Sequence, residues 1–172
     1  GGDAEGVRNL IGAQPNLVDH PYLDYLVRCA SERADRAVIQ AFLDAVPNLF
    51  ERITVTRGDP ATVRWLLSSG MQSNLPNWLG WTPMHELAHR NDMTLAPLFL
   101  EFGAALDAID AVEKSTPLGI ACRDGHHEMV DWLLKKGADP NGGGDTWSRP
   151  MAWAKRSGRA QIRALLKLNG AA

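Results

Sequence analysis

One stretch of the chain, Thr116–Asn141 (TPLGIACRDGHHEMVDWLLKKGADPN), carries a pattern that recurs at a fixed interval. Its Thr-Pro start returns as Thr82-Pro83 and, altered, as Arg149-Pro150, so the three prolines are 34 and 33 residues apart. A glycine that follows an apolar stretch recurs with the same period, as Gly70, Gly103, Gly137 and Gly170. Two landmarks that share one period indicate a repeat architecture, in which each unit stacks on its neighbour.

Each unit is expected to fold as two short helices joined by a tight turn. The Thr116 hydroxyl can cap the first helix, and the proline after it suits the first helical position. Gly125 then breaks the chain before a second helix, and Gly137 supplies the left-handed conformation that ends it. The segment 138–141 that follows carries the turn residues Asp139, Pro140 and Asn141. These residues predict an all-α fold of helix-turn-helix units with hairpin-like loops between them.

This order of features resembles the ankyrin-repeat family. The family pattern of Thr-Pro-Leu-His, Gly-His, a leucine pair and Gly-Ala-Asp-x-Asn is nearly complete in residues 116–141. The resemblance is strong from Gly58 to Gly170 and weaker upstream, where Gly2-Asp3 echoes Gly58-Asp59 and Pro15–Asp19 echoes Pro47–Glu51. It implies a solenoid of about five stacked repeats, the N-terminal ones divergent.

The resemblance also divides the chain. We expect a single domain over residues 1–172, with divergent N-terminal capping repeats at 1–48, repeats at 49–81, 82–115 and 116–148, and a C-terminal capping repeat at 149–172. A separate small helical domain at 1–48 is the alternative.

Two residues depart from the pattern at helix starts. Pro97 falls where a second helix is expected, and an interior proline costs about 3 kcal/mol. We therefore predict that this helix begins near Thr94, which places Pro97 in its first turn. Arg149 replaces the capping threonine, at a cost of about 1 kcal/mol unless Ser148 substitutes for it.

A short string, His85–His89, matches the H-E-x-x-H motif of zinc metallopeptidases. On a helix the two histidines would share a face and bind Zn²⁺, while Glu86 polarised water. Candidates for the third ligand that zinc requires are Glu101, Asp110 and Glu113. The family resemblance instead implies that His85 is a structural hydrogen-bonding residue. We therefore expect no catalytic residue, no metal and no cofactor, with a zinc-dependent hydrolase as the alternative.

The resemblance implies that a protein partner binds on the concave face, at the hairpin tips and first helices. The residues expected to contact it are Trp78, Leu79, Trp81, His89, Arg90, Asp110, Glu113, Lys114, Arg123, Asp124, Trp147 and Arg156. Trp78 and Trp81 stand out because tryptophan is enriched at interface hot spots; the alternative is that they pack on the adjacent hairpin. Trp65 and Trp132 share one second-helix position and are expected in the core between repeats.

Charge is distributed unevenly along the chain, although its formal total of −2 gives no overall bias toward nucleic acid. Six basic and no acidic residues follow Asp145, whereas residues 1–145 hold 12 basic and 20 acidic ones. We interpret the basic end as the solvated face of a cap. An acidic partner, or head-to-tail contact between opposite ends of two copies, is the alternative.

Together these features predict a non-catalytic protein-protein interaction module with an unidentified protein partner. We expect no small-molecule substrate, no nucleic acid, no membrane contact and a monomeric state. Cys29 and Cys122 are isolated, which excludes a disulfide framework. A cytoplasmic location is expected, because neither a signal pattern nor an apolar run of about 20 residues occurs. A structural segment of a larger protein is the alternative function.

Overall fold

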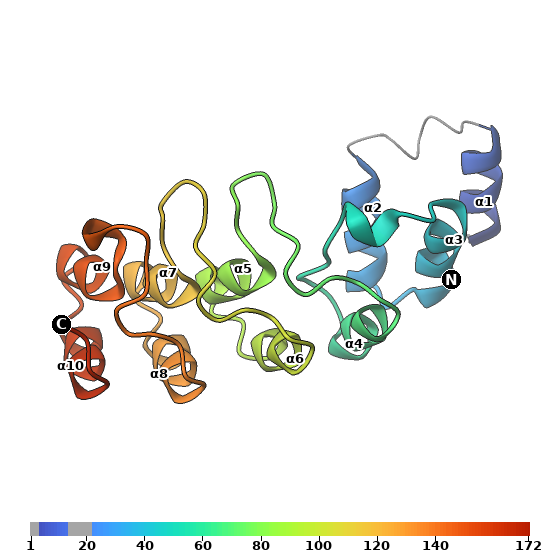
Figure 1. Cartoon of the computed structure of the whole chain (residues 1–172). Helices are drawn as coiled ribbons and strands as arrows, with labels where there is room; N and C mark the ends of the chain where they lie inside the picture. Colours follow the sequence, from blue (N-terminus) through green and yellow to red (C-terminus); the bar gives the residue numbers. More distant parts are fainter. Residues whose placement is uncertain (1–3, 14–21) are drawn as a thin grey trace. The chain divides into compact units, whose positions relative to one another are not determined.

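The computed structural model describes residues 4–13 and 22–172 (Figure 1). Within this described part every regular element is a helix, so the predicted all-α class is confirmed. The sequence echoes at Gly2-Asp3 and Pro15–Asp19 lie outside the described residues. The chain divides into two compact units, residues 1–75 and residues 76–172.

The first unit is built from four α-helices and one short turn of 3₁₀ helix within its described residues. They are α1 (Ala4–Ala13), α2 (Tyr22–Glu32), α3 (Arg36–Ala45), η2 (Leu49–Glu51) and α4 (Pro60–Ser68). Helices α1 and α2 each pack against α3. The fully buried apolar side chains of this unit include Val27, Ile39, Leu49, Val63 and Leu66.

Residues 52–57 differ from the first helix of a complete repeat unit. They follow η2 without regular secondary structure, and Ile53-Thr54-Val55-Thr56 is a run of four β-branched residues. Such side chains lose rotamer freedom in a helix and favour extended backbone. Ile53 and Val55 are nevertheless buried, and the Val55 N–H lies 3.3 Å from the Met71 sulfur. The segment thus contributes to the core as an extended chain.

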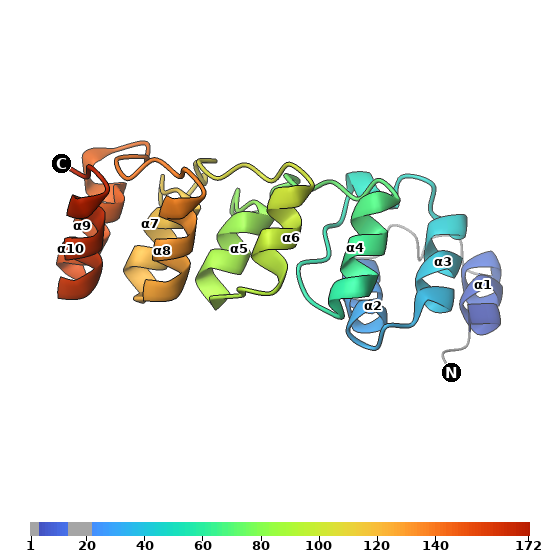
Figure 2. The ribbon, with the colours of Figure 1, turned by 90° about the horizontal axis from the view of Figure 1, so that it is seen from below.

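The second unit consists of three helix pairs, as the repeat period predicts. They are α5 (Pro83–Arg90) with α6 (Leu95–Glu101), α7 (Pro117–Asp124) with α8 (His127–Lys135), and α9 (Pro150–Arg156) with α10 (Ala160–Leu168), the last preceded by η3 (Thr146–Ser148). Helix α7 packs between α5 and α9, and α8 packs against α10. Figure 2 shows the first and second helices of each pair side by side within this unit.

Caps and core contacts in the second unit follow the predicted roles. The Thr116 hydroxyl accepts a hydrogen bond from the Gly119 N–H at 3.2 Å, and Gly125 ends α7 with a φ of +85°. Leu87, Leu118 and Leu133 are fully buried. Burial of each such side chain stabilises the fold by about 1.5–3 kcal/mol.

Helix α6 begins as predicted, with Thr94 before its first residue, so Pro97 lies in the first turn. Thr94 makes no capping bond with its side chain; instead, the Asp92 carboxylate accepts a hydrogen bond from the Leu95 N–H at 3.0 Å at the start of the helix. Ser148 does not cap α9. Its hydroxyl accepts a hydrogen bond from the Asp145 N–H at 3.1 Å and lies 2.7 Å from the Lys114 carbonyl oxygen.

Two further observations bear on expectations from sequence. Trp65 and Trp132, which were expected in the core, are each only half-buried. In the first unit, the Arg36 guanidinium lies over the Trp65 ring at 5.7 Å. Among the described residues, no helix has the length and apolarity that a bilayer crossing requires.

Candidate functional site

The hairpins before α5 and α7 extend away from their helices on the side opposite α6 and α8 (Figure 1). Asn77 organises the first of them. Its side-chain oxygen accepts hydrogen bonds from the N–H groups of Leu79 at 2.9 Å and Trp81 at 3.1 Å, and its amide donates to Glu86 at 3.0 Å. Trp78 lies at the tip with 89% of its surface exposed, so a fixed loop presents a free indole.

The second hairpin is organised by Asp110, one of the residues expected to touch a partner. Asp110 is only 1% exposed. Its carboxylate accepts hydrogen bonds from the N–H groups of Val112 at 2.8 Å, Glu113 at 2.6 Å and Ser115 at 2.9 Å. The structure therefore gives Asp110 the task of shaping the hairpin, while Val112 at the tip is exposed.

Neighbouring hairpins lie in direct contact. Gly80 has a φ of +76°, and a Cβ built there would lie 2.6 Å from the Ala111 backbone nitrogen. On the other side, the Gly144 N–H donates a hydrogen bond to the Lys114 carbonyl oxygen at 2.8 Å. The three tips therefore form a continuous row within the second unit.

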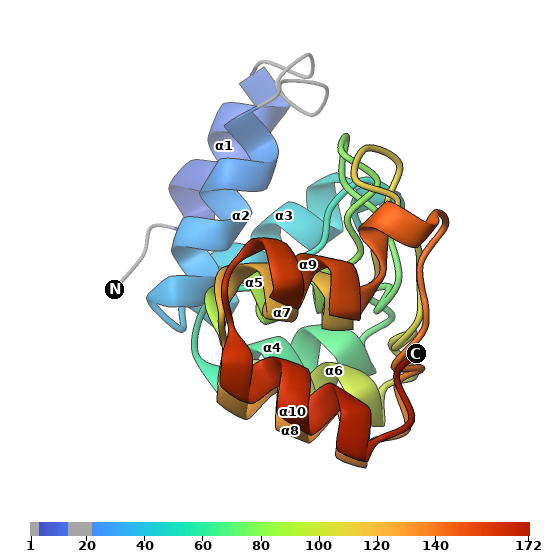
Figure 3. The same ribbon diagram turned by 90° about the vertical axis from the view of Figure 1, so that its left-hand side faces the viewer.

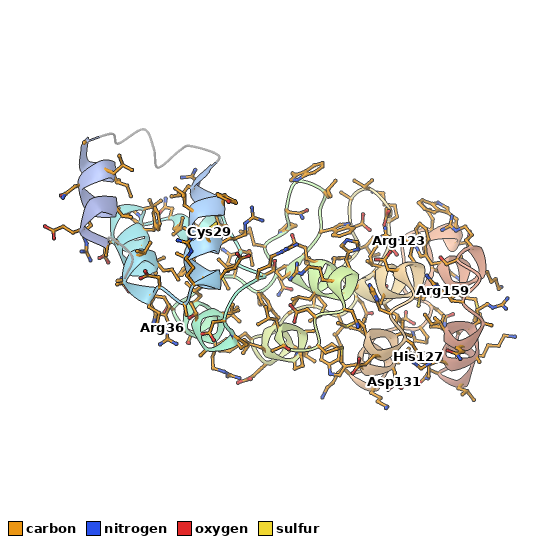
Figure 4. The ribbon with its side chains drawn as sticks, turned by 180° about the vertical axis from the view of Figure 1, so that it is seen from behind. Cys29, Arg36, Arg123, His127, Asp131 and Arg159 are labelled. Atoms are coloured by element: carbon orange, nitrogen blue, oxygen red, sulfur yellow. The ribbon has the colours of Figure 1, made fainter. Side chains whose placement is uncertain are left out.

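Below the tips, cationic and aromatic side chains alternate from one repeat to the next. Arg123 lies over the rings of Trp81 and Trp153, at 5.8 Å from each. Arg156 lies over Trp153 at 3.9 Å and over Trp147 at 5.7 Å. Each such contact contributes about 0.5–2 kcal/mol. We call these five residues the cation–aromatic ladder; Figure 4 shows Arg123 at its position on α7.

Arg123 is bound by carboxylates as well as by rings. Its Nε donates a hydrogen bond to Asp124 at 2.8 Å, and its Nη1 pairs with Glu113. The His89 Nδ1 lies 2.8 Å from the other Asp124 oxygen, which ties α5 to α7. Burial alone would raise the pKa of Asp124, but its bonds to Arg123 and His89 outweigh burial and hold that pKa below its usual range.

The predicted site residues thus differ in their exposure and in how far other residues of the chain already bind them. Arg90 pairs with Glu86 and Asp92, so it resembles Arg123 in being held by carboxylates of its own unit. The residues of the predicted set that are exposed are Trp78, His89, Lys114, Trp147 and Arg156. Leu79 and Trp81 are half-buried.

His85 is fully buried, and both of its ring nitrogens have protein partners. Nδ1 accepts a hydrogen bond from the Thr82 N–H at 3.1 Å, so Nε2 carries the proton and donates to the Ser115 carbonyl oxygen at 3.1 Å. Burial lowers the pKa of His85 and keeps the ring neutral. A metal ion at this ring would displace one of these bonds. The geometry supports the structural role that the resemblance implies for His85.

Other candidate chemistry is also accounted for by packing. Within the described residues, no group of three or more His, Cys, Asp or Glu side chains is arranged to hold a metal ion. Cys122 is fully buried, and burial raises the pKa of its thiol, so it is a poor nucleophile.

Three residues of this surface were missing from the sequence-based set. Val112 and Ile109 are apolar hairpin residues that are exposed, and Trp153 is half-buried in the ladder. The position of Trp153 three residues before Arg156 on α9 was the available signal, because side chains at that spacing meet on a helix.

Comparison with known sequences gives a family match and several relatives. Residues 52–143, more than half of the chain, match a family model described as ankyrin repeats in three copies. The Drosophila melanogaster palmitoyltransferase Hip14 is 38% identical over 92 residues, which cover 53% of this chain and 14% of that protein.

Two further relatives carry ankyrin repeats by name. The ankyrin repeat, SAM and basic leucine zipper domain-containing protein 1 of Ornithorhynchus anatinus is 30% identical over 141 residues, 79% of this chain and 29% of that protein. The human ankyrin repeat and SOCS box protein 3 is 31% identical over 91 residues, 52% of this chain and 18% of that protein. The chain therefore spans less than a third of each of these relatives.

Proposed function

Because the chain belongs to the ankyrin-repeat family, we propose that it is a non-catalytic module that holds a protein partner on the hairpin tips and cation–aromatic ladder of its second unit. Ankyrin repeats are generally protein-interaction modules. A rigid surface loses little conformational entropy when a partner binds, which favours affinity.

The observation that carries this proposal is the combination of a fixed backbone and a free side chain at Trp78. Asn77 holds the loop through three hydrogen bonds, yet the indole is 89% exposed. An exposed tryptophan on a rigid loop offers a large apolar surface that is buried only when a partner arrives. Val112 and Trp147 extend this apolar surface along the row of tips.

The zinc-hydrolase alternative is disfavoured by the contacts of the histidine pair. His85 is enclosed with its nitrogens bonded to Thr82 and Ser115, and His89 is bonded to Asp124. A structural segment of a larger protein is the second alternative. It predicts that no partner depends on the exposed tips, so capture of a partner distinguishes it from our proposal.

The test is affinity capture with three immobilised baits: the wild-type chain, Trp78→Ala and Leu168→Ala. Leu168 is a matched control because it is a large apolar residue, 85% exposed, on α10 and away from the tips. Partners retained by the wild type and by Leu168→Ala but lost from Trp78→Ala support the proposal. Equal retention by all three baits, or a clear fall in the melting temperature of Trp78→Ala, contradicts it.

A further inference from the structure

Three residues occupy one position in successive repeats of the second unit. His89, Arg123 and Arg156 each lie six residues after the proline that begins their helix, in α5, α7 and α9. Each also contacts an aromatic ring of the cation–aromatic ladder: His89 lies 5.3 Å from Trp81, and the two arginines lie over their rings as described above.

We call His89, Arg123 and Arg156 the column. Its first two members are bound by carboxylates of the chain itself. Asp124 bonds both His89 and Arg123, and Glu113 pairs with Arg123. Asp124 is the last residue of α7, and Glu113 lies four residues before the first proline of that helix.

The last repeat has the cation but lacks these acids. At the positions equivalent to Glu113 and Asp124, counted from Pro150, the sequence has Thr146 and Ser157. Ser157 instead donates a hydrogen bond to the Arg123 carbonyl oxygen at 2.9 Å. Among the described residues, no carboxylate lies within ion-pair distance of Arg156.

Arg156 is nevertheless held in a defined orientation. Its guanidinium stacks at 3.9 Å over Trp153, lies near Trp147, and donates one hydrogen bond to the Trp147 carbonyl oxygen at 2.7 Å. A guanidinium has five N–H donors in a planar fork that matches a carboxylate. The residue is exposed, and one hydrogen bond occupies only one of these donors.

The charge around Arg156 favours an acidic ligand. The six basic residues that follow Asp145 are all exposed, and residues 146–172 contain no acidic residue. Where ion pairs are seen in the second unit, they lie earlier in the chain, at Arg90, Arg123 and Lys135. The acidic residues between α8 and α9 are Asp139 and Asp145.

We propose that Arg156, stacked on Trp153 and beside Trp147, is the anchor for an Asp or Glu carboxylate in an acidic segment of the partner protein. The segment supplies to the last repeat the acid that Glu113 and Asp124 supply to the repeat before it. This inference rests on the proposed protein-binding function and names the chemistry of the partner.

The test uses an acetylated and amidated peptide of ten glutamates as the probe and a peptide of ten glutamines as its neutral control. Binding is measured by calorimetry at low salt, and ¹⁵N spectra follow the Nε–H signal of Arg156. The variants are Arg156→Gln and the matched control Arg163→Gln, which removes one exposed charge on α10 that lies over no aromatic ring of the described residues. Removing one charge-assisted hydrogen-bonding partner predicts a loss of about tenfold or more for Arg156→Gln and about twofold or less for Arg163→Gln.

Several results would overturn the inference. They are equal losses in the two variants, equal binding of the glutamine peptide, tighter binding of a DNA duplex than of the glutamate peptide, and self-association of the chain that Arg156→Gln abolishes. The Trp78→Ala variant separates this inference from the proposed function, because Trp78 lies in another hairpin. If the glutamate peptide does not bind but partner capture still depends on Trp78, only the inference is refuted. If the peptide binds through Arg156 but partner capture does not depend on Trp78, only the proposed function is refuted.

Discussion

Replacement of His85 by alanine tests whether the histidine pair is structural. The change removes the acceptor of the Thr82 N–H and the donor to the Ser115 carbonyl oxygen, and both of those residues are buried. The Thr82 N–H then loses its partner, which costs about 1–3 kcal/mol, whereas the Ser115 carbonyl oxygen keeps its hydrogen bond from the Asp110 N–H at 3.0 Å. The lost ring also leaves a cavity, which adds to the cost. We therefore expect the free energy of unfolding to fall by about 3–5 kcal/mol.

His89→Ala is the matched control for this measurement, because it removes the same ring four residues later on the same helix. The His89 side chain is 51% exposed and its one side-chain bond is to Asp124. An exposed ion pair contributes about 1 kcal/mol or less, so His89→Ala should cost little. Urea unfolding followed by far-ultraviolet circular dichroism measures both values. Losses of similar size, or a loss below about 1 kcal/mol for His85→Ala, would refute the structural role.

Three further predictions follow from titrating and constrained groups. Burial lowers the pKa of His85, so as pH falls below about 6.5 this histidine takes up a proton in the unfolded chain before it does so in the folded protein. The free energy of unfolding should therefore be constant above that pH and fall below it by up to about 1.4 kcal/mol per pH unit. A urea series from pH 7 to 5 without such a fall contradicts this. The pKa of Asp124 is below its usual range, so its contribution to the free energy of unfolding is present above about pH 4 and is lost as pH falls further. Below about pH 4 the free energy of unfolding should therefore fall more steeply in the wild type than in Asp124→Asn, and parallel pH profiles of the two proteins would count against this. Gly80→Ala combines a left-handed φ with a Cβ only 2.6 Å from the Ala111 nitrogen, so it should lower stability by about 1–3 kcal/mol in thermal unfolding, and an unchanged melting temperature would disagree.

Helix pairing and helix starts could be predicted from sequence because they depend on local residues. Prolines spaced by 33 and 34 residues mark helix starts, and glycines mark helix ends, with steric requirements that no tertiary context alters. The same local logic placed Pro97 correctly in the first turn of α6. By contrast, residues 52–57 lie where a repeat would have its first helix, and there the β-branched run prevails over the period.

Side-chain exposure at the hairpin tips could not be predicted in the same way. Trp78 and Trp81 are three residues apart in one loop, yet Trp78 is exposed and Trp81 is half-buried against His89 and Arg123. The burial of Asp110 was equally unpredictable from sequence, because it depends on the loop closing over its carboxylate. Such outcomes depend on how neighbouring hairpins meet, which a single sequence does not specify.

The arrangement in the last repeat lies between these two cases. The register counted from Pro150 already places Arg156 in the column of His89 and Arg123, and Thr146 and Ser157 where acids stood before. Knowing that those acids bind Arg123 required the structure. The basic end that we interpreted from sequence as a solvated cap is therefore also the surface that we propose binds an acidic segment of the partner.

The affinity of a captured partner for the wild-type chain and for Trp78→Ala tests the central proposal most directly. If the partner buries the Trp78 indole, calorimetry should show binding weakened by about thirtyfold, as loss of a hot spot of about 2 kcal/mol requires, with the melting temperature unchanged. An equal dissociation constant for the two proteins would mean that the exposed tips of the second unit do not hold the partner.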